Sequence, residues 1–366
     1  MNSEPANGYQ SSLEDIYMRF IKSDININFI GKSRLALYIS ATMILISFIS
    51  LILHKGPKYG VDFAGGTLIQ VKLFAPASIN VIKSGLDTID LGKSSVQQFG
   101  DKEGNEYLIR TDISVMTSQE GLSGKVKNAL ESTTGDKVEI RRIEMVGPQV
   151  GKDLREKALF AMFYALLFIT IYISGRFELK WIISGIMAAV LMSGVYFLSF
   201  INLSIPILIT AALILALILF WVLNLKYAMG AIAALIHDVI ITVGIFSVFD
   251  KEFTLPIIAA LLTIIGYSLN DTIIVFDRIR ENLKKYRKKP LDVIINRSIN
   301  ETLSRTILTS LTTLIVVIAL FVIGGGIIHD FAFAMILGII IGTYSSIYIA
   351  SPILLAWQKR GKKILS

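Results

Sequence analysis

The chain has 366 residues, of which 53% are hydrophobic, and its mean hydropathy is +0.63. This composition excludes an ordinary soluble globular protein, because the apolar residues form blocks as long as a bilayer span. The formal net charge of +8 does not indicate a nucleic-acid-binding protein, because the basic residues collect in short loops and at the termini, as they do in polytopic membrane proteins.

A polar leader, residues 1–34, precedes the first apolar segment at 35–53. The exit from this segment, HKGPKYG, has no small-x-small cleavage site. We therefore interpret 35–53 as an uncleaved transmembrane helix and not as a signal peptide.

The next segment, 54–155, has the composition of a soluble domain. Alternating apolar residues predict strands, and 3.6-residue periodicity with turn signals predicts helices. In chain order these are a strand at 66–74, a helix at 78–89, strands at 94–99 and 106–111, a helix at 118–134 and a strand at 137–146. The order β-α-β-β-α-β predicts a ferredoxin-like α+β domain.

Seven further apolar windows are long enough for tilted helices across a hydrocarbon core of about 30 Å. They lie at 157–174, 181–200, 204–223, 228–249, 254–276, 306–323 and 331–356. The sequence thus predicts eight spans, with a bundle at 156–358 that contains an extra hydrophobic hairpin near 180–225. Only INL separates the two windows of this hairpin, so it could instead dip into the bilayer. Either arrangement leaves both termini on the same side.

Basic residues predict the orientation of the bundle. They gather in the leader, in DRIRENLKKYRKKP at 277–290 and in the tail at 359–366. The positive-inside rule places all three segments in the cytoplasm. The domain 54–155 then lies on the opposite side of the membrane.

The extra hairpin resembles the segment that follows it. The stretch beginning LKWIISGIM at 179 matches LKYAMGAIA at 225, with an offset of 46 to 50 residues. Either this is an internal repeat, or it is the coincidence expected of two hydrophobic segments. In a true repeat, Leu191 and Met192 would replace His237 and Asp238.

An aspartate interrupts the apolar segment 254–276. Asp271 lies 16 residues, or about 24 Å, from the outer end of this helix, in the cytoplasmic third of the bilayer. Thr263, Tyr267 and Arg278 share its helix face, and Asn270 lies beside it. Because an unpaired charge in hydrocarbon costs about 3 kcal/mol or more, we interpret Asp271 as a carboxylate that gains and loses a proton. A polar helix-packing site, or a span that ends before Asp271, is the alternative.

Asp277 is a different kind of residue. It lies about 9 Å further along the same helix and opens the basic stretch. We expect it at the membrane boundary, where it pairs with Arg278 or Arg280 or caps the next helical turn.

Arg305 begins the seventh span on the cytoplasmic side, so its depth roughly matches that of Asp271. It either extends to the lipid headgroups or pairs with Asp271 when that carboxylate is ionised and separates when it is protonated. The second interpretation describes a switch between two helix packings.

His237 and Asp238 lie near the bilayer centre. Adjacent residues on a helix point about 100° apart, so we expect that they do not pair with each other and that each needs another partner or water. A proton relay and a buried packing pair are both compatible with the sequence.

Motifs for nucleotide, metal or hydrolytic chemistry are absent from the sequence. GVDFAGGT at 60–67 lacks the GK[ST] ending of a P-loop. The chain has no cysteine and only three scattered histidines, and no catalytic triad or paired carboxylates are visible. We expect no enzyme activity, no metal and no cofactor.

Several motifs together resemble, in order, the SecF family of the bacterial protein-export machinery, within the RND superfamily. They are YGVDFAGGTLIQV, RRIEMVGPQVGKDLREKA, GRFELKW, ALIHDVIITVGIFS, AALLTIIGYSLNDTIIVFDRIREN and TLSRTILTSLTTL. The resemblance covers roughly residues 30–358. It identifies Asp271 and Arg305 as proton-coupling residues, and we add Asn270, His237 and Asp238 to this group. We assign a structural role to Gly60, Asp62, Phe63, Gly65, Gly66, Gly266 and Tyr267.

The resemblance implies a location and partners. Such proteins lie in the bacterial inner membrane with both termini cytoplasmic and the 54–155 domain periplasmic. They act with SecD beside the SecYEG channel, with YajC as a further partner. They use the proton motive force to draw preproteins outward after the ATP-driven motor SecA has pushed them.

One departure from the family is the additional length near 180–225, because such proteins have six spans. The alternative function is an RND-like exporter of small molecules or lipids, which is expected to carry two such halves in one chain. A non-pumping assembly scaffold is a third possibility, favoured if Asp271 faces the headgroups.

Overall fold

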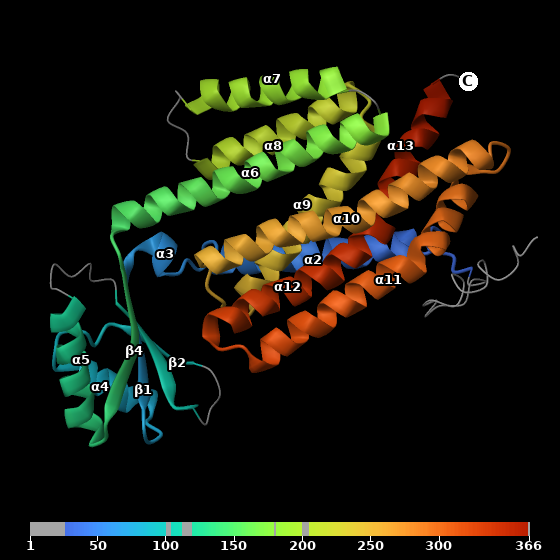
Figure 1. The fold of residues 1–366 in the computed structure, drawn as a ribbon. Helices are drawn as coiled ribbons and strands as arrows, with labels where there is room; N and C mark the ends of the chain where they lie inside the picture. Colours follow the sequence, from blue (N-terminus) through green and yellow to red (C-terminus); the bar gives the residue numbers. More distant parts are fainter. Residues whose placement is uncertain (1–25, 100–103, 112–118, 179–180, 200–204, 365–366) are drawn as a thin grey trace, which may run out of the picture.

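A computed structural model describes residues 26–99, 104–111, 119–178, 181–199 and 205–364. Most of the leader and the last two residues of the tail therefore lie outside the described residues. The chain forms a small α/β domain at one end of a long helix bundle (Figure 1). We call this end of the bundle the domain end and the opposite end, which carries the 286–290 connection, the basic end.

The α/β domain contains a four-stranded antiparallel sheet in the order β2-β3-β1-β4. Its strands are β1 (Gly66–Leu73), β2 (Ser95–Phe99), β3 (Glu106–Thr111) and β4 (Val138–Val146), and its helices are α4 (Ile79–Asp87) and α5 (Gln119–Thr134). The predicted order of strands and helices is confirmed. A short helix that was not predicted, α3 (Val61–Ala64), precedes β1.

Alternation along β1 explains how this domain is built. Ile69, Val71 and Leu73 are buried, while the residues between them are half-exposed. The buried side chains pack with apolar residues of α4 and α5, among them Ile82 and Leu130. One face of the sheet is therefore covered by the two helices, as the period-2 pattern predicts.

Six helices are long and apolar enough to cross a membrane, counted over the described residues. They are α2 (Ser33–Leu53), α6 (Pro148–Glu178), α9 (Lys226–Val248), α10 (Leu255–Lys285), α11 (Leu291–Ile323) and the continuous segment Gly326–Trp357. The last of these comprises α12 (Gly326–Ser345), a π-helix (Ser346–Ala350) and α13 (Ser351–Ile364), which extends beyond it.

The extra hydrophobic segment forms two helices, α7 (Trp181–Ser199) and α8 (Ile205–Val222). Their described apolar stretches, Trp181–Gly194 and Leu213–Val222, are shorter than the six long ones. They contact α6 and each other, and α7 and α11 lie on opposite sides of the bundle (Figure 1). The described part of the chain thus has about six long apolar helices, and the predicted count of eight spans is not confirmed.

Three helices extend beyond their predicted spans. The helix α6 starts at Pro148, before the predicted domain boundary at 155, and α11 starts at Leu291 rather than near 306. The helix α10 continues past 276 to Lys285. These extensions are polar, so the apolar windows of the sequence do not reveal them.

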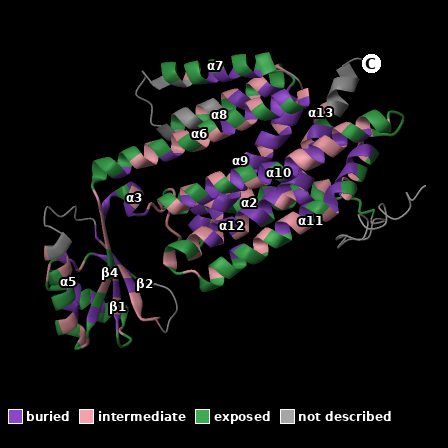
Figure 2. Cartoon of the chain, viewed as in Figure 1, coloured by how far each residue is buried: buried purple, intermediate pink, exposed green. Residues whose placement is uncertain are grey.

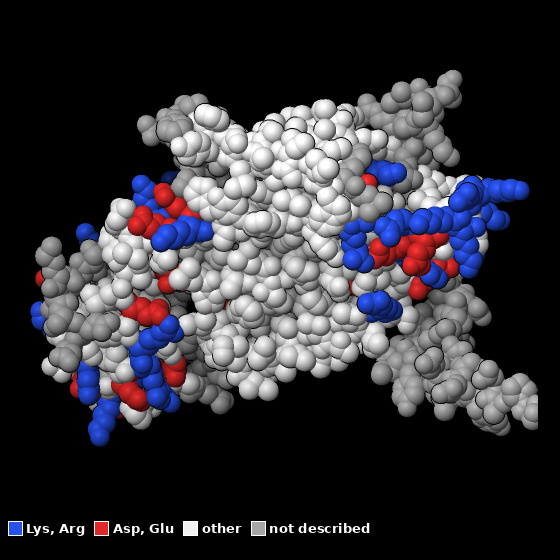
Figure 3. All heavy atoms as spheres, turned by 45° about the horizontal axis from the view of Figure 1, so that its top comes forward, with Lys and Arg blue, Asp and Glu red and all other residues white. Residues whose placement is uncertain are grey.

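Charged residues gather at the two ends of the molecule and leave a band between them almost free of charge (Figure 3). In the burial view, the helices that surround α9 turn exposed residues outward and buried ones inward (Figure 2). A band of exposed apolar side chains between two charged zones is typical of a bilayer-spanning bundle.

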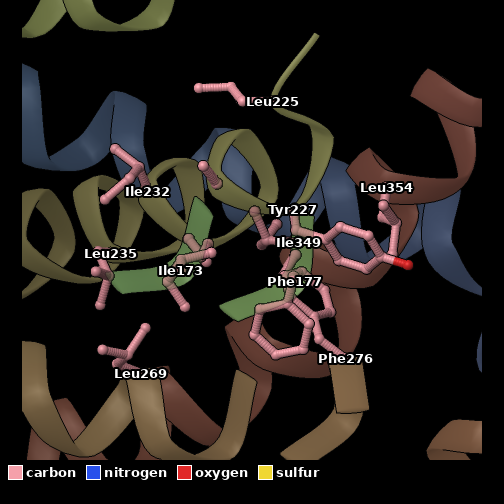
Figure 4. Packing of buried hydrophobic residues seen from close by; sticks show 14 of the residues in the cluster. Ile173, Phe177, Leu225, Tyr227, Ile232, Leu235, Leu269, Phe276, Ile349 and Leu354 are labelled. Atoms are coloured by element: carbon pink, nitrogen blue, oxygen red, sulfur yellow. The ribbon is translucent and has the colours of Figure 1, made fainter. Parts of the chain in front are cut away.

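The bundle core is filled by aromatic and aliphatic side chains from several helices. Phe177 of α6 lies against Tyr227 of α9 and Phe276 of α10, with ring centroids 5.2 and 5.8 Å away. Figure 4 shows this group with Ile349 and Leu354 beside it. These contacts fix the three helices to one another at the basic end.

Two glycines let α12 approach α10 closely. A Cβ atom on Gly338 would lie 2.2 Å from the Ile264 side chain, and one on Gly342 would lie 2.8 Å from Ser268 Cβ. Small residues four positions apart allow this kind of packing between membrane helices. The close approach brings the polar residues that follow on α12 to the interior of the bundle.

We predict that Gly342→Ala destabilises the protein. The new methyl group overlaps α10, and overpacking of this kind costs about 1–3 kcal/mol. The variant should melt several degrees lower in detergent, by differential scanning fluorimetry. Gly185→Ala on α7 is the matched control, because a Cβ there meets nothing within 4 Å. Equal melting temperatures for both variants would contradict the close α10–α12 contact.

Candidate proton-coupling site

Asp271 is completely buried inside the bundle, with 0% relative exposure. Its Oδ2 atom is 3.5 Å from both the Ser310 hydroxyl of α11 and the Thr343 hydroxyl of α12. These two hydroxyls lie only 2.6 Å from each other. Among the described residues, the Oδ1 atom has no hydrogen-bond partner. The carboxyl group therefore has only long hydrogen-bond contacts, and its Oδ1 atom is available to carry a proton.

Asp238 is buried to 1% but is held much more tightly. Its Oδ2 atom accepts hydrogen bonds from the hydroxyls of Ser268 (2.6 Å) and Ser345 (2.8 Å), which belong to α10 and α12. Its Oδ1 atom lies 2.9 Å from Nδ1 of His237. This carboxyl group thus connects α9, α10 and α12.

The expectation that His237 and Asp238 do not pair was wrong. The two Cβ atoms do point in different directions, but the imidazole ring is long enough to bring Nδ1 back to the neighbouring carboxyl group. The ring also stacks on Tyr344, with centroids 6.2 Å apart. Its Nε2 atom has no partner in the described part of the chain.

A π-helix follows the residues that bind the two carboxyl groups. It covers Ser346–Ala350, and Ser351 donates its hydroxyl to the carbonyl of Ser346 at 3.0 Å. Such insertions interrupt the normal hydrogen-bond ladder and are frequent at functional sites. Here the π-helix directly succeeds Ser345, the residue that donates to Asp238.

Arg305 does not contact Asp271. Antiparallel helices α10 and α11 place Asp271 level with Ser310 and Arg278 level with Glu301. Arg305 therefore lies about one helical turn, or about 6 Å, nearer the basic end than Asp271. Its side chain is exposed, and within the described chain no ion pair forms between the two groups.

A polar stripe on α10 faces outward. Thr263, Gly266 and Asn270 recur at helical spacing and are exposed, whereas Asp271 points inward. Tyr267 stands between the two faces and donates its hydroxyl to the carbonyl of Thr309 on α11 at 3.0 Å. Exposed Arg305 and Thr312 extend the outward polar surface onto α11.

Asp277 pairs with a residue that sequence reasoning missed. Its Oδ2 atom lies 2.6 Å from Nη2 of Arg176, at the end of α6. The expected local pairing with Arg278 or Arg280 was wrong, because both of those side chains point elsewhere. Arg278 binds Glu301, and Arg280 donates to the carbonyl of Arg176.

The glycine-rich motif lies at the domain end, far along α10 from Asp271. Gly65 and Gly66 have φ angles of 79° and 113°, which only glycine adopts easily. Gly60 and Phe63 are buried, and Asp62 is half-buried. Within the described chain, no three His, Asp or Glu side chains gather in a way that could hold a metal ion.

Sequence reasoning found both buried carboxyl groups but missed most of their partners. Ser268, Thr343 and Ser345 are small hydroxyl residues within apolar helices. The available signal was their position beside small residues, as in GxxxG followed by TYSS. That pattern indicates a close helix contact, but it does not show which carboxyl group the hydroxyls reach.

Comparison with known proteins places these features in a family. The family "Protein export membrane protein SecD/SecF, C-terminal" matches residues 125–205 and 199–360, and "SecD/SecF GG Motif" matches residues 50–73. The two parts of the first match meet inside the extra hairpin.

The relatives cover nearly the whole chain. The chain is 44% identical to the protein translocase subunit SecF of Magnetococcus marinus over 339 residues, or 92% of this chain and 93% of the relative. It is 42% identical to that of Calditerrivibrio nitroreducens over 338 residues, or 92% and 95%.

The fold resembles the crystal structure of SecDF from Thermus thermophilus. The TM-score is 0.68, with 31% sequence identity over 95% of this chain. The present chain spans only 41% of that longer SecDF chain.

We predict that Asp238→Ala strongly destabilises the bundle. The substitution removes the carboxyl group that His237, Ser268 and Ser345 all contact, and breaking a buried polar network of this kind costs about 3 kcal/mol. Thermal unfolding in detergent should show the loss, while the exposed control Asp153→Ala should unfold like the unmodified protein. An unchanged melting temperature for Asp238→Ala would show that the cluster does not hold the helices together.

Proposed function

The chain belongs to the SecF family of protein translocase subunits, and from this premise we propose that it couples the proton motive force to late steps of preprotein export. It is a multi-pass membrane protein that associates with SecD and the Sec translocase. Asp271 is the group that we propose takes up and releases the driving proton.

The state of Asp271 carries this proposal. Asp271 is fully buried, has two long hydroxyl contacts and forms no ion pair with the described residues, so it is costly to keep charged in an apolar bundle. The observed packing therefore suits the neutral acid. Release of the proton leaves a buried negative charge on Asp271. Because this charge is unpaired in the observed packing, it favours a rearrangement of the helices that gives it a partner.

Arg305 is the nearest candidate partner for the ionised form. It lies about one turn away on α11, and its side chain is long and exposed. We propose that Arg305 moves toward Asp271 when the proton leaves and moves away when it returns. Asn270 lies on the outward side of the same turn of α10. We also propose that His237 and Asp238, which are joined by a hydrogen bond, take part in the proton coupling.

The α/β domain is the part that we propose meets the emerging preprotein in the periplasm. It is joined to the bundle near the start of α10, where Arg110 of β3 pairs with Glu252. Its element order and its β2-β3-β1-β4 sheet, with α4 and α5 on one face, support a ferredoxin-like fold. Movement of α10 would tilt this domain.

The charge distribution supports the proposed orientation. The last turn of α10 and the connection to α11 together carry five basic residues between 284 and 289, and the positive-inside rule places this segment in the cytoplasm of a bacterial inner-membrane protein. Both termini then lie in the cytoplasm. SecYEG and YajC are further proposed partners, and we propose no enzymatic activity, cofactor or metal.

The outward polar stripe on α10 is the surface that we propose packs against SecD. Thr263 and Asn270 lie at membrane depth, where polar groups face protein or water rather than lipid. The stripe includes Gly266, above which a Cβ would meet nothing within 4 Å. The helices α7 and α8 lie on another side of the bundle and leave this surface open, so the extra hairpin is compatible with SecD binding.

We predict that Asp271→Asn removes the proton-dependent part of export. The amide cannot release a proton, so a preprotein translocation assay in membrane vesicles should lose its stimulation by the proton motive force. ATP-driven translocation and co-purification with SecD should persist. Asp277→Asn is the control, because that carboxylate is partly exposed and paired. Stimulation that survives in Asp271→Asn would refute the proposal.

We also predict that Asn270→Cys forms a disulfide or a short cross-link with a cysteine placed in a membrane helix of SecD. The chain has no native cysteine, so the background is clean. Ile182→Cys on α7, 79% exposed, is the matched control and should not react with SecD. Cross-linking from α7 in place of α10 would reverse the assignment of the two surfaces.

A further inference from the structure

The glycine-rich motif contains a carboxylate, that of Asp62, to which the proposed proton coupling assigns no role. Asp62 belongs to α3, and its Oδ2 atom accepts a hydrogen bond from the backbone N–H of Leu255 at the domain end of α10, at 2.8 Å. Leu255 is the first residue of α10, the helix that carries Asp271. Asp62 and Leu255 are 193 positions apart in the chain.

This hydrogen bond completes the first turn of α10. The N–H groups of Ile257 and Ile258 both bond to the carbonyl of Thr254, and Pro256 has no N–H group. The Thr254 side chain makes no capping hydrogen bond. Within this first turn, the N–H of Leu255 is thus the donor that has no acceptor in its own helix. Asp62 supplies an acceptor with the negative charge that a helix N-terminus favours.

The same segment is attached to the start of α10 by its backbone. Phe253 donates its N–H to the carbonyl of Lys58, and Gly60 donates to the carbonyl of Phe253, both at 2.7 Å. Lys58 and Asp250 form an ion pair at 2.6 Å. Residues 58–62 therefore form a short parallel pairing with the loop that leads into α10, and Asp62 is its last contact.

On its other side the segment is joined to the sheet and to α6. Gly65 leads directly into β1, and a Cβ on it would lie 2.8 Å from Pro148 Cα at the start of α6. A Cβ on Gly151 would lie 3.0 Å from the Gly65 nitrogen. The segment is thus packed closely against the start of α6, directly before β1.

We propose that Asp62 is a positioning residue that fastens the outer end of α10 to the α/β domain, so that movement at Asp271 reaches the domain. This inference rests on the proposed function. The helix α10 itself transmits the movement, because Leu255 and Asp271 are about 24 Å apart on this one continuous helix. Without the Asp62 contact, α10 would move while the domain responds less.

A cysteine pair tests this attachment directly. The backbone of Gly60 has a φ of −71°, which any residue adopts, and a Cβ there lies 2.7 Å from Thr254 Cγ2. Gly60→Cys with Thr254→Cys can therefore meet the Cβ separation of about 3.5–4.5 Å that a disulfide needs. The rate of disulfide formation in the full-length protein reports how firmly the segment is held against α10.

We expect Asp62→Ala to slow this disulfide formation about fivefold, the change produced by loss of a helix cap worth about 1 kcal/mol. Asp62→Asn should stay within about twofold, because its carbonyl oxygen still accepts the hydrogen bond. Disulfide formation that is as fast in Asp62→Ala as with Asp62 present would overturn the proposal.

Export in membrane vesicles provides the second measurement. Asp62→Ala should lose most of the stimulation by the proton motive force, and the oxidised 60–254 disulfide should restore it until a reductant is added. Asp87→Ala, an exposed carboxylate on the domain, should behave like the unmodified protein. If Asp271→Asn fails in export and Asp62→Ala does not, the inference is wrong and the proposed function stands. If Asp271→Asn exports normally, the proposed function is wrong, and the rate of disulfide formation alone decides the positioning role of Asp62.

Discussion

A carboxyl group among apolar helices must be neutral, paired with a cation or surrounded by donors, because water cannot stabilise its charge there. Asp238 and Asp271 satisfy this constraint in different ways. Asp238 has three partners within 3 Å, from its own helix and two others. Among the residues that the structure describes, Asp271 has only two contacts, both at 3.5 Å, and one of its oxygens has no partner. The first group is suited to hold helices together and the second to change its protonation state.

Much of the bundle serves these two groups. The close α10–α12 contact requires Gly338 and Gly342, and two of the hydroxyls that reach the carboxyl groups, those of Thr343 and Ser345, follow on α12. The helices that carry the carboxyl groups are also attached at their ends by acidic residues from distant segments. Glu178 of α6 accepts the N–H of Tyr227 in the first turn of α9 at 2.9 Å, as Asp62 does for α10. Both contacts link a helix terminus to a segment outside the helix.

The sequence was informative wherever periodicity and burial cost act locally. Alternation along 66–73 predicted a strand, and the cost of a charge in hydrocarbon singled out Asp271, which is indeed fully buried. Long-range partners were not predictable in this way. Nothing near Asp277 indicates Arg176, 101 residues away, and the local pairing rule selected Arg278 and Arg280 instead.

Side-chain reach was a second source of error. The rule that neighbours on a helix diverge by about 100° describes Cβ directions, and the ring of His237 is long enough to overcome it. The count of eight spans was not confirmed, because windows of apolar residues do not report whether a helix crosses the bilayer. The hairpin α7–α8 satisfied the composition test, and the structure describes the parts Trp181–Gly194 and Leu213–Val222 of its apolar stretches.

The central claim is that Asp271 takes up and releases a proton as the protein works. Infrared difference spectroscopy on the SecD-associated protein in membrane vesicles measures this directly through the carbonyl stretch of a protonated carboxylic acid. Our account predicts a band that changes when the proton motive force is applied and that is missing from the Asp271→Asn variant. A protonation signal that stays constant, or that persists in the variant, would contradict it.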